Sequence, residues 1–218
     1  MATALVTVRA LRDQLVDRLR SDLLSSRFRA GQKIGQDEIA TMYGVSRTPA
    51  REAILQLRNE GLLEAMPKGG VQVAGQIDDA TRGFLNGLRH LVEEHALRIC
   101  LDELTDDDYA ALARIVKKMK AACKRRDDTA LAEHDIAFHR YLVERSKTPT
   151  LISIWSLIVG GIRFSFQTAY AAFEDRMEIH REHEEILERF RAGDTEAAIT
   201  FYASRIGIIP QRNAKRRK

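Results

Sequence analysis

The sequence predicts a mainly α-helical protein with two parts: a small helical domain that includes a β-hairpin, and a larger all-α bundle of about six helices. Two observations predict this fold class. Between Gln36 and Val73, a helix, a tight turn, a second helix and a Gly-rich hairpin follow one another. From Asp79 to about Ile209, apolar residues recur at helical spacing and no segment alternates as a strand would. We therefore expect domains at 1–75 and 76–210, with a basic tail at 211–218.

The chain begins with a helix predicted from about Val8 to Ser26. Its leucines recur every four residues, a spacing that puts them on one face of the helix: Leu11, Leu15, Leu19 and Leu23. The stripe stops before Gly31. We therefore expect the first helix of the small domain rather than a free-standing coiled-coil segment.

A second helix is predicted over Asp37–Met42 and ends at the Tyr43-Gly44 break. Ser46 or Thr48 caps the next helix, and Pro49 lies in its first turn, where a missing N–H costs least. This helix separates apolar residues from arginines around its circumference: Ala50, Ile54 and Leu57 against Arg47, Arg51 and Arg58. The pattern indicates a helix-turn-helix with a cationic outer face.

Two short apolar pieces follow Gly61, at 62–66 and 71–74, separated by the turn Pro67-Lys68-Gly69-Gly70. A helix-turn-helix with a hairpin behind it is a winged helix, which places its second helix in a DNA major groove and its wing on the flanking groove or backbone. An arginine-bearing surface helix alone is usually just solvated; the ordered combination favours DNA binding.

Charge and composition restrict the partners. The net charge of +4 is divided along the chain: +3 over residues 1–75, −4 over 76–210 and +5 over 211–218. Cys100 and Cys123 have no short spacing, which argues against a disulfide framework or a thiolate zinc site. The longest apolar run, near Leu151–Ile162, is too short to span a bilayer. We expect a cytoplasmic protein with no membrane partner.

The bundle is predicted to contain helices at about 79–101, 105–126, 129–145, 149–172, 175–191 and 194–209, with a weak point at Gly160-Gly161. Within it, Asp135 and His139 are four apart and share one helix face, and His180 and His183 are three apart on another helix. A carboxylate and imidazoles that converge in a bundle can hold a divalent transition metal. On spacing alone, surface or satisfied core residues are the better interpretation.

The residues of the small domain resemble the winged-helix domain of GntR-family bacterial transcription regulators. The resemblance rests on Gly44-Val45-Ser46-Arg47-Thr48-Pro49-Ala50-Arg51-Glu52-Ala53-Ile54, on Glu60-Gly61-Leu62, and on Pro67-Lys68-Gly69-Gly70-Val71-Gln72-Val73. It implies DNA contacts by Arg47, Thr48 and Arg51, with Gly70 at the wing tip. Two positions depart from the family pattern: Asp37 and Gly69 stand where arginine is common, and Lys68 beside Gly69 supplies a charge at the wing.

The bundle resembles the ligand-binding domain of the FadR branch of that family, called FCD. The residues that carry it are Glu133-His134-Asp135-Ile136-Ala137-Phe138-His139, His183-Glu184-Glu185-Ile186-Leu187, Ala192-Gly193-Asp194 and Ala197-Ala198. The resemblance implies a metal, such as zinc or nickel, held by an aspartate and three histidines with a small carboxylic acid bound against it. Asp135, His139 and His183 match three of these ligands.

The fourth ligand position, counted from Gly193, falls at Arg205. A guanidinium cannot ligate a metal, but it forms a bidentate pair with a carboxylate. Two arrangements follow. Either His180 or water completes a weakened metal site, or the site holds no metal and Arg205 binds an anionic effector together with the histidines. We favour the second arrangement.

Other side chains of the bundle are candidates for the effector site. Arg89 matches an arginine that holds the effector carboxylate in similar proteins, and the alternative is an ion pair with Glu93 at i+4. Arg163 is a looser candidate. Four aromatic residues line a pocket or simply belong to the core: Trp155, Phe164, Phe166 and Tyr170.

We therefore expect a homodimeric transcription regulator, a repressor rather than an activator, that binds a palindromic double-stranded operator and is released by a small carboxylate. It is not expected to be an enzyme. Two alternatives stay open: a metalloenzyme built on Asp135, His139 and His183, and an architectural DNA-binding protein without an effector. The tail Gln211–Lys218 adds nonspecific attraction to phosphates or only solubility.

Overall fold

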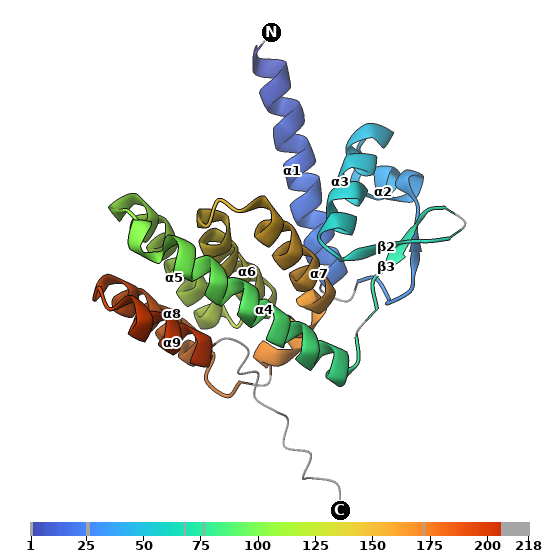
Figure 1. The fold of residues 1–218 in the computed structure, drawn as a ribbon. Coiled ribbons are helices and arrows are strands. Elements are labelled where there is room, and N and C mark those ends of the chain that lie inside the picture. Colours follow the sequence, from blue (N-terminus) through green and yellow to red (C-terminus); the bar gives the residue numbers. More distant parts are fainter. Residues whose placement is uncertain (1, 25–26, 68, 76, 172, 206–218) are drawn as a thin grey trace, which may run out of the picture. The chain divides into compact units, whose positions relative to one another are not determined.

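The computed structural model describes residues 2–24, 27–67, 69–75, 77–171 and 173–205, and within these ranges the side chains of 2–10, 164, 167, 168 and 171 are not described (Figure 1). The protein is mainly helical with a small antiparallel sheet, so the predicted fold class is confirmed. The chain divides into two compact units: residues up to Asp78 together with Val159–Phe164, and the remainder. Each unit is described by itself.

The first unit is a winged helix. Three helices and three short strands build it: α1 (Ala2–Leu24), β1 (Lys33–Ile34), α2 (Gln36–Tyr43), α3 (Arg47–Asn59), β2 (Leu63–Ala65) and β3 (Val71–Val73). The sheet order is β1-β3-β2, and both pairs are antiparallel. The hairpin expected after Gly61 is therefore present as β2 and β3.

Strand β1 is an addition to the predicted elements. Its two residues pair with the inner wing strand, Lys33 opposite Gln72 and Ile34 opposite Val71. A strand of two residues is too short for the alternation by which strands are recognised in a sequence. It completes the sheet because the loop before α2 runs beside β3.

The core of this unit is built on the leucine stripe of α1. Leu15, Leu19 and Leu23 are buried, and they pack with Ile39 of α2 and Leu57 of α3. The stripe is shorter than predicted, because Leu11 is 47% exposed. The helix itself extends beyond the predicted start and is helical from Ala2.

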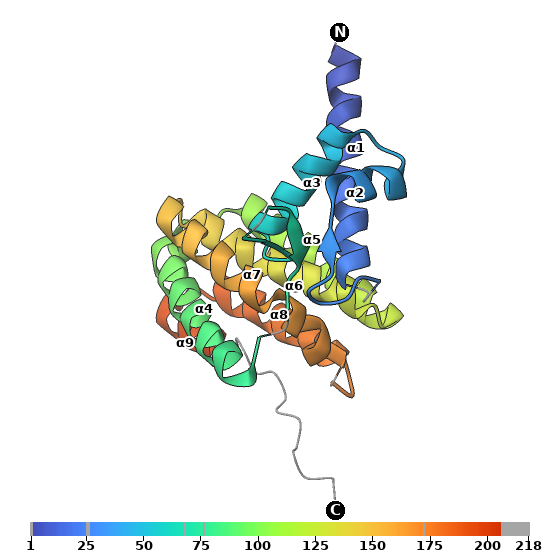
Figure 2. The same cartoon turned by 90° about the vertical axis from the view of Figure 1, so that its right-hand side faces the viewer.

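The second unit is an all-helical bundle. Its elements are α4 (Asp79–Cys100), a 3-10 turn (Leu101–Glu103), α5 (Asp106–Arg125), α6 (Asp128–Arg145), α7 (Pro149–Ala171), α8 (Met177–Arg191) and α9 (Thr195–Arg205). Helix α9 agrees with the predicted sixth helix over its described part, and residues 206–209 lie outside the described residues, as does the tail. Figure 2 shows α4 and α7 running next to one another along the same side of the bundle.

Local signals fix the helix ends. Thr105 caps α5 as predicted: its Oγ1 accepts from the Asp108 N–H, and the Asp108 carboxylate accepts from the Thr105 N–H at 2.9 Å. The helix predicted at about 149–172 is confirmed as α7, which is helical through Gly160 and Gly161. Burial of Ile158, Val159 and Ile162 supplies packing that outweighs the helix propensity lost at two glycines.

Candidate functional site

The tight turn between α2 and α3 positions the arginine-bearing helix. Gly44 ends α2 in the left-handed conformation at φ 65°, which a residue with a Cβ adopts only with strain, and Ser46 is the N-cap residue of α3. Ala50 and Leu57 face the core at 0% exposure. Arg47, Thr48 and Arg51 all lie on the exposed side of α3. The sequence-predicted DNA residues of this helix therefore share one solvent-facing surface.

One of these arginines is already paired. The Arg47 guanidinium contacts the Asp37 carboxylate of α2, with Nε 2.7 Å from Oδ1. Both side chains are well exposed, at 74% and 63%, so the pair is worth at most about 1 kcal/mol. Asp37, the residue that departs from the family pattern, thus holds an arginine of the recognition helix in the absence of DNA.

The wing turns at two glycines. Gly69 and Gly70 both have φ of 86°, and the turn is closed by hydrogen bonds from the Gly69 N–H to Met66 O at 3.0 Å and from the Met66 N–H to Gly70 O at 3.1 Å. Gly70 therefore lies at the wing tip. Lys68, the predicted wing cation, lies outside the described residues.

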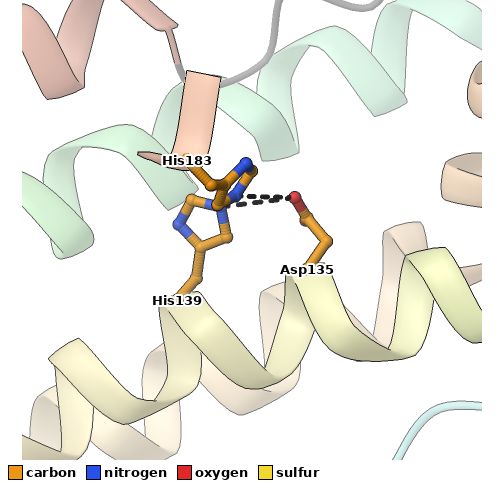
Figure 3. A group of neighbouring side chains, drawn as sticks. All are labelled: Asp135, His139 and His183. Carbon is orange, nitrogen blue, oxygen red and sulfur yellow. Dashed lines mark ion pairs between the residues drawn. The ribbon is translucent and has the colours of Figure 1, made fainter. Parts of the chain in front are cut away.

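A buried polar cluster lies in the bundle. Asp135 and His139 project from one face of α6, and His183 reaches them from α8 (Figure 3). One ligand atom from each residue lies within 4.8 Å of the others, and the three residues are at most 5% exposed. The structure therefore brings together the three residues that match the FCD metal ligands, on two helices far apart in the sequence.

His183 presents a lone pair to the carboxylate. Its Nδ1 lies 2.7 Å from Ile179 O, the backbone carbonyl one turn earlier, so Nδ1 carries a proton and donates. In the neutral ring, Nε2 is then an acceptor, and it lies 3.2 Å from Oδ1 of Asp135, another acceptor. This Nε2 is buried without a hydrogen-bond partner among the described residues. Two buried acceptors at this distance need a cation between them, either a proton or a metal ion.

His139 is oriented by a carboxylate on another helix. Its Nε2 faces Asp135, 3.6 Å from Oδ1, while Nδ1 lies 2.6 Å from the Tyr202 hydroxyl and 3.2 Å from Oε2 of Glu93. Burial lowers the pKa of His139, but the nearby Glu93 carboxylate outweighs this effect and the pKa is raised overall. An imidazole held by a carboxylate at one nitrogen, with the other nitrogen turned toward a second ligand group, is the arrangement found around metal-ligating histidines.

Both buried carboxylates remain ionised. Burial raises the pKa of Glu93, but the positive charges of Arg89 and His139 lower it further, and the result lies well below the ordinary range. Burial likewise opposes ionisation of Asp135, and His139 and His183 overcome it. The fixed charges of the cluster are therefore two carboxylates against one guanidinium.

Arg89 supplies that guanidinium. It is 3% exposed; its Nε donates to Oε1 of Glu93 at 2.6 Å, and its Nη2 lies 3.8 Å from Oδ2 of Asp135. The ring of Phe166 lies beneath it, with the guanidinium carbon 5.0 Å from the ring centre. Arg89 thus lies beside the cluster, but it is paired, as the ion-pair alternative expected, and the pair is buried rather than on the helix surface.

Arg205 does not join the cluster, which contradicts the expectation that it occupies the fourth position. Its guanidinium lies 3.6 Å from the carboxylate of Glu182, and its side chain is 38% exposed. Tyr202, one turn earlier on α9, is the residue that faces the cluster, because the α9 surface that packs inward passes through this tyrosine. His180 does not complete the site either: it is not among the grouped ligand residues, and its Nε2 lies 3.2 Å from the Glu184 carboxylate.

The remaining candidates divide between the cluster and the core. Tyr170 is buried close enough to Asp135 for this carboxylate to help raise the pKa of its hydroxyl, and Trp155 Nε1 donates to Oε1 of Glu93 at 2.6 Å. Arg163 is buried and belongs to the segment of α7 grouped with the first unit. The side chain of Phe164 lies outside the described residues.

Sequence reasoning missed two members of the cluster, Glu93 and Tyr202. Glu93 accepts hydrogen bonds from Arg89, Trp155 and Tyr202, three side chains on three helices. The sequence offered only the i, i+4 spacing from Arg89, which is common on exposed helices. For Tyr202 the sequence held no signal, because a helical tyrosine that packs in the core and one that donates a hydrogen bond to a buried carboxylate look the same in a sequence.

The fold and the two sites define a class of protein: a winged-helix DNA-binding domain joined to a helical domain with a buried polar site. Comparison with known families agrees. The family described as "Bacterial regulatory proteins, gntR family" matches residues 11–73, and the FCD domain matches residues 85–204. The chain belongs to the GntR family of bacterial regulatory proteins with an FCD domain. It is a DNA-binding transcription regulator and not an enzyme.

Individual relatives are similar along most of their length. The regulator YdhC of Bacillus subtilis is 26% identical over 190 residues, which cover 85% of this chain and 83% of that protein. The gluconate operon transcriptional repressor of Bacillus licheniformis is 25% identical over 174 residues, 74% of this chain and 69% of that one. The solved structure of Escherichia coli McbR/YncC has the same fold, with a TM-score of 0.69 at 22% identity, covering 89% of this chain and 92% of that one.

Among the described helices, none combines the length and the apolar character needed to cross a bilayer.

Proposed function

We propose that the chain is a repressor that binds a two-fold symmetric operator as a homodimer, and that a small carboxylate bound beside a metal ion in the helical domain releases it. The observation that carries this proposal is the buried pair of acceptors, His183 Nε2 and Asp135 Oδ1, 3.2 Å apart. The gluconate operon relative, named a repressor, supports the sign of regulation.

The donor set fits a divalent transition metal. Asp135, His139 and His183 offer one carboxylate oxygen and two imidazole nitrogens, a combination that zinc, nickel and related ions accept. Each histidine already uses its second nitrogen: His139 toward Glu93 and His183 toward a backbone carbonyl. The bound ion would supply Lewis acidity at a coordination position that the three protein ligands leave open. The arrangement in which Arg205 replaces the ion loses its support, because this arginine pairs with Glu182.

The charge of the cluster indicates the class of effector. Glu93 and Asp135 outweigh the Arg89 guanidinium by one negative charge, so the metal-free cluster attracts a cation, such as the proton of His139, rather than an anion. A divalent ion reverses the balance to one positive charge. The loaded site then suits a monocarboxylate, which neutralises it. To release the operator, this ligand must bind the DNA-incompetent arrangement better than the competent one.

An apolar surface on the bundle supports a homodimer. On α4, Phe84 and Leu91 are 66% and 65% exposed, and on α7, Ile154 and Leu157 are 44% and 79% exposed. Both helices run along the same side of the bundle, joined by the hydrogen bond from Trp155 to Glu93 (Figure 2). Exposed apolar surface of this kind marks an interface. We propose a second copy as its occupant, since a symmetric operator requires two identical winged helices.

In vitro selection of DNA followed by fluorescence anisotropy tests the function. We expect selection to yield a palindrome, and a panel of small monocarboxylates to contain one that weakens its binding about tenfold or more, only when the protein holds a metal. Selection without any enriched sequence would overturn the regulator mechanism. An enriched sequence whose affinity no acid changes would leave the architectural alternative.

Light scattering tests the dimer. The wild-type protein should have twice the chain mass of 24.7 kDa. Leu157→Glu, which buries a charge in the proposed interface, should reduce the mass to that of one chain. Met42→Glu, which adds the same charge to an exposed residue of the winged helix, should leave the mass unchanged. A wild-type monomer, or a dimeric Leu157→Glu protein, would contradict this surface.

A further inference from the structure

A cavity lies between α5 and α8 of the helical domain. The two helices run antiparallel and are tied at both ends: the Tyr109 hydroxyl donates to Phe190 O at 3.1 Å, and the Cys123 thiol donates to Arg176 O at 3.2 Å. Between these ties the helices leave a space of about 460 Å³. This volume is within the range of small-molecule sites. The residues that line it do not include any of the cluster ligands Asp135, His139 and His183.

His180 lines this cavity and has no other evident role. It is 2% exposed, and neither ring nitrogen has a hydrogen-bond partner among the described residues. The Glu184 carboxylate lies 3.2 Å from Nε2 but outside hydrogen-bonding geometry, and its side chain is 49% exposed. Burial, aided by the charge of Lys120, lowers the pKa of His180, so the ring is neutral and carries one N–H. A buried N–H without an acceptor is rare in folded proteins, and here it borders a space large enough for a ligand.

The charges around the cavity favour an anion. Lys117 and Lys120 line it from α5, and neither forms an ion pair with any described residue. Arg191 lies at the far end, over the ring of Tyr109 at 4.6 Å. Two carboxylates, Glu184 and Glu188, also line the cavity. Three cations against two carboxylates leave one positive charge, which suits a monoanion better than a dianion.

Apolar groups form the rest of the wall. Val116 of α5 is buried, and Leu187 of α8 is partly buried. A ligand that consists only of a charged group would leave these apolar side chains exposed to water. A ligand that also carries a compact hydrocarbon or aromatic group would bury them, which is favourable. The chemistry of the cavity therefore combines a cationic end, a buried donor and an apolar wall.

We propose that the α5–α8 cavity is a second ligand site of the helical domain, which binds a small monocarboxylate with an apolar body. The carboxylate lies between Lys120 and the ring of His180, and the apolar body lies against Val116 and Leu187. The site is separate from the Asp135–His139–His183 cluster and needs no metal. Helix α8 carries residues of both sites, His180 in the cavity and His183, three residues later, in the cluster.

The test uses benzoate as the probe and the full-length protein labelled with ¹⁵N at histidine. Six histidines give six sets of ring signals, and His180→Gln assigns one of them by its loss. We expect benzoate to move the His180 signal saturably at concentrations up to about 10 mM, a range that detects even weak binding. Benzamide, of the same shape without the charge, should not move it. A His180 signal that stays in place with benzoate, or moves equally with benzamide, would overturn the proposal.

Variants on α5 test the assignment independently of His180. Lys120→Met keeps the hydrocarbon stem and removes the charge, and it should weaken benzoate binding about tenfold, the effect of losing one charge-assisted hydrogen bond. Lys124→Met, on the same helix but outside the cavity, should bind benzoate as the wild type does. Unchanged affinity in Lys120→Met would refute the site. Loss of the His180 response in His139→Ala would also refute it, because the response would then originate at the central cluster.

Discussion

If the proposed metal site is correct, a divalent metal ion stabilises this protein thermally, and removal of the His183 imidazole is expected to abolish that stabilisation. In the structure, Nε2 of His183 is one of three ligand atoms within 4.8 Å of each other, and it is buried without a partner. The variant His183→Gln leaves Asp135 and His139 as the remaining ligands. Two ligands on one helix hold an ion far more weakly than three ligands on two helices.

The expected size of the effect follows from linkage. An ion present at a hundred times its dissociation constant stabilises the folded protein by about 2.7 kcal/mol, provided that it does not bind the unfolded chain. For a chain of this length, 1 kcal/mol corresponds to about 2–4 °C in melting temperature. The wild-type protein should therefore melt about 5–11 °C higher with the ion than after dialysis against a chelator. For His183→Gln the two melting temperatures should coincide.

Differential scanning fluorimetry with zinc, nickel and manganese measures these shifts. The matched control is His134→Gln, which replaces a partly buried histidine of α6 next to Asp135 that takes no part in the cluster. It should retain the full metal-dependent rise. An equal rise in His183→Gln and the wild type would show that the ion binds elsewhere, and no rise in the wild type with any of the three ions would refute the metal site.

Three further outcomes are expected. Arg51→Ala should weaken operator binding at least about fivefold and reduce the slope of log affinity against log salt by about 0.9 if the side chain contacts phosphate, without changing the metal-dependent melting shift. Asp37→Ala frees Arg47 from its 2.7 Å ion pair and should strengthen operator binding, by about fivefold at most, in the same anisotropy assay; weaker binding would show that the pair orders the helix for DNA. The raised pKa of His139 means that its proton stabilises the folded metal-free protein fully below about pH 6.5, and this stabilisation is lost as pH rises through the folded-state pKa. The melting temperature of chelator-treated protein should therefore fall across that window, and a melting temperature that rises there would contradict the assignment.

The winged helix was predictable because its signals are local. Gly44 at positive φ, the cap residue Ser46 and the Gly69-Gly70 turn each specify a backbone conformation within a few residues. Only strand β1 was missed, since its two residues are a strand only because β3 lies beside them. The helix predicted over 149–172 is also present, because burial of the neighbours of Gly160 and Gly161 offsets the low helix propensity of the two glycines.

The buried cluster was predictable only in part. Asp135 and His139 share a helix face by spacing, so their proximity follows from the helix alone. Their partners come from α4, α8 and α9, and which side of α9 faces inward depends on packing that no single helix encodes. Counting residues from Gly193 therefore predicted Arg205 at the fourth position of the cluster. In the structure Tyr202 faces the cluster instead, and Arg205 pairs with Glu182.

Trp155 is the single tryptophan in 218 residues. Its indole N–H donates a hydrogen bond to Glu93, the carboxylate that orients His139. It is 1% exposed, so bulk solvent does not quench it directly. Excitation at the red edge of indole absorption, where tyrosine does not absorb, therefore isolates one chromophore that is hydrogen-bonded to the buried polar cluster. The protein carries its own optical reporter, and occupation of that cluster can be followed by emission intensity and colour without any attached dye.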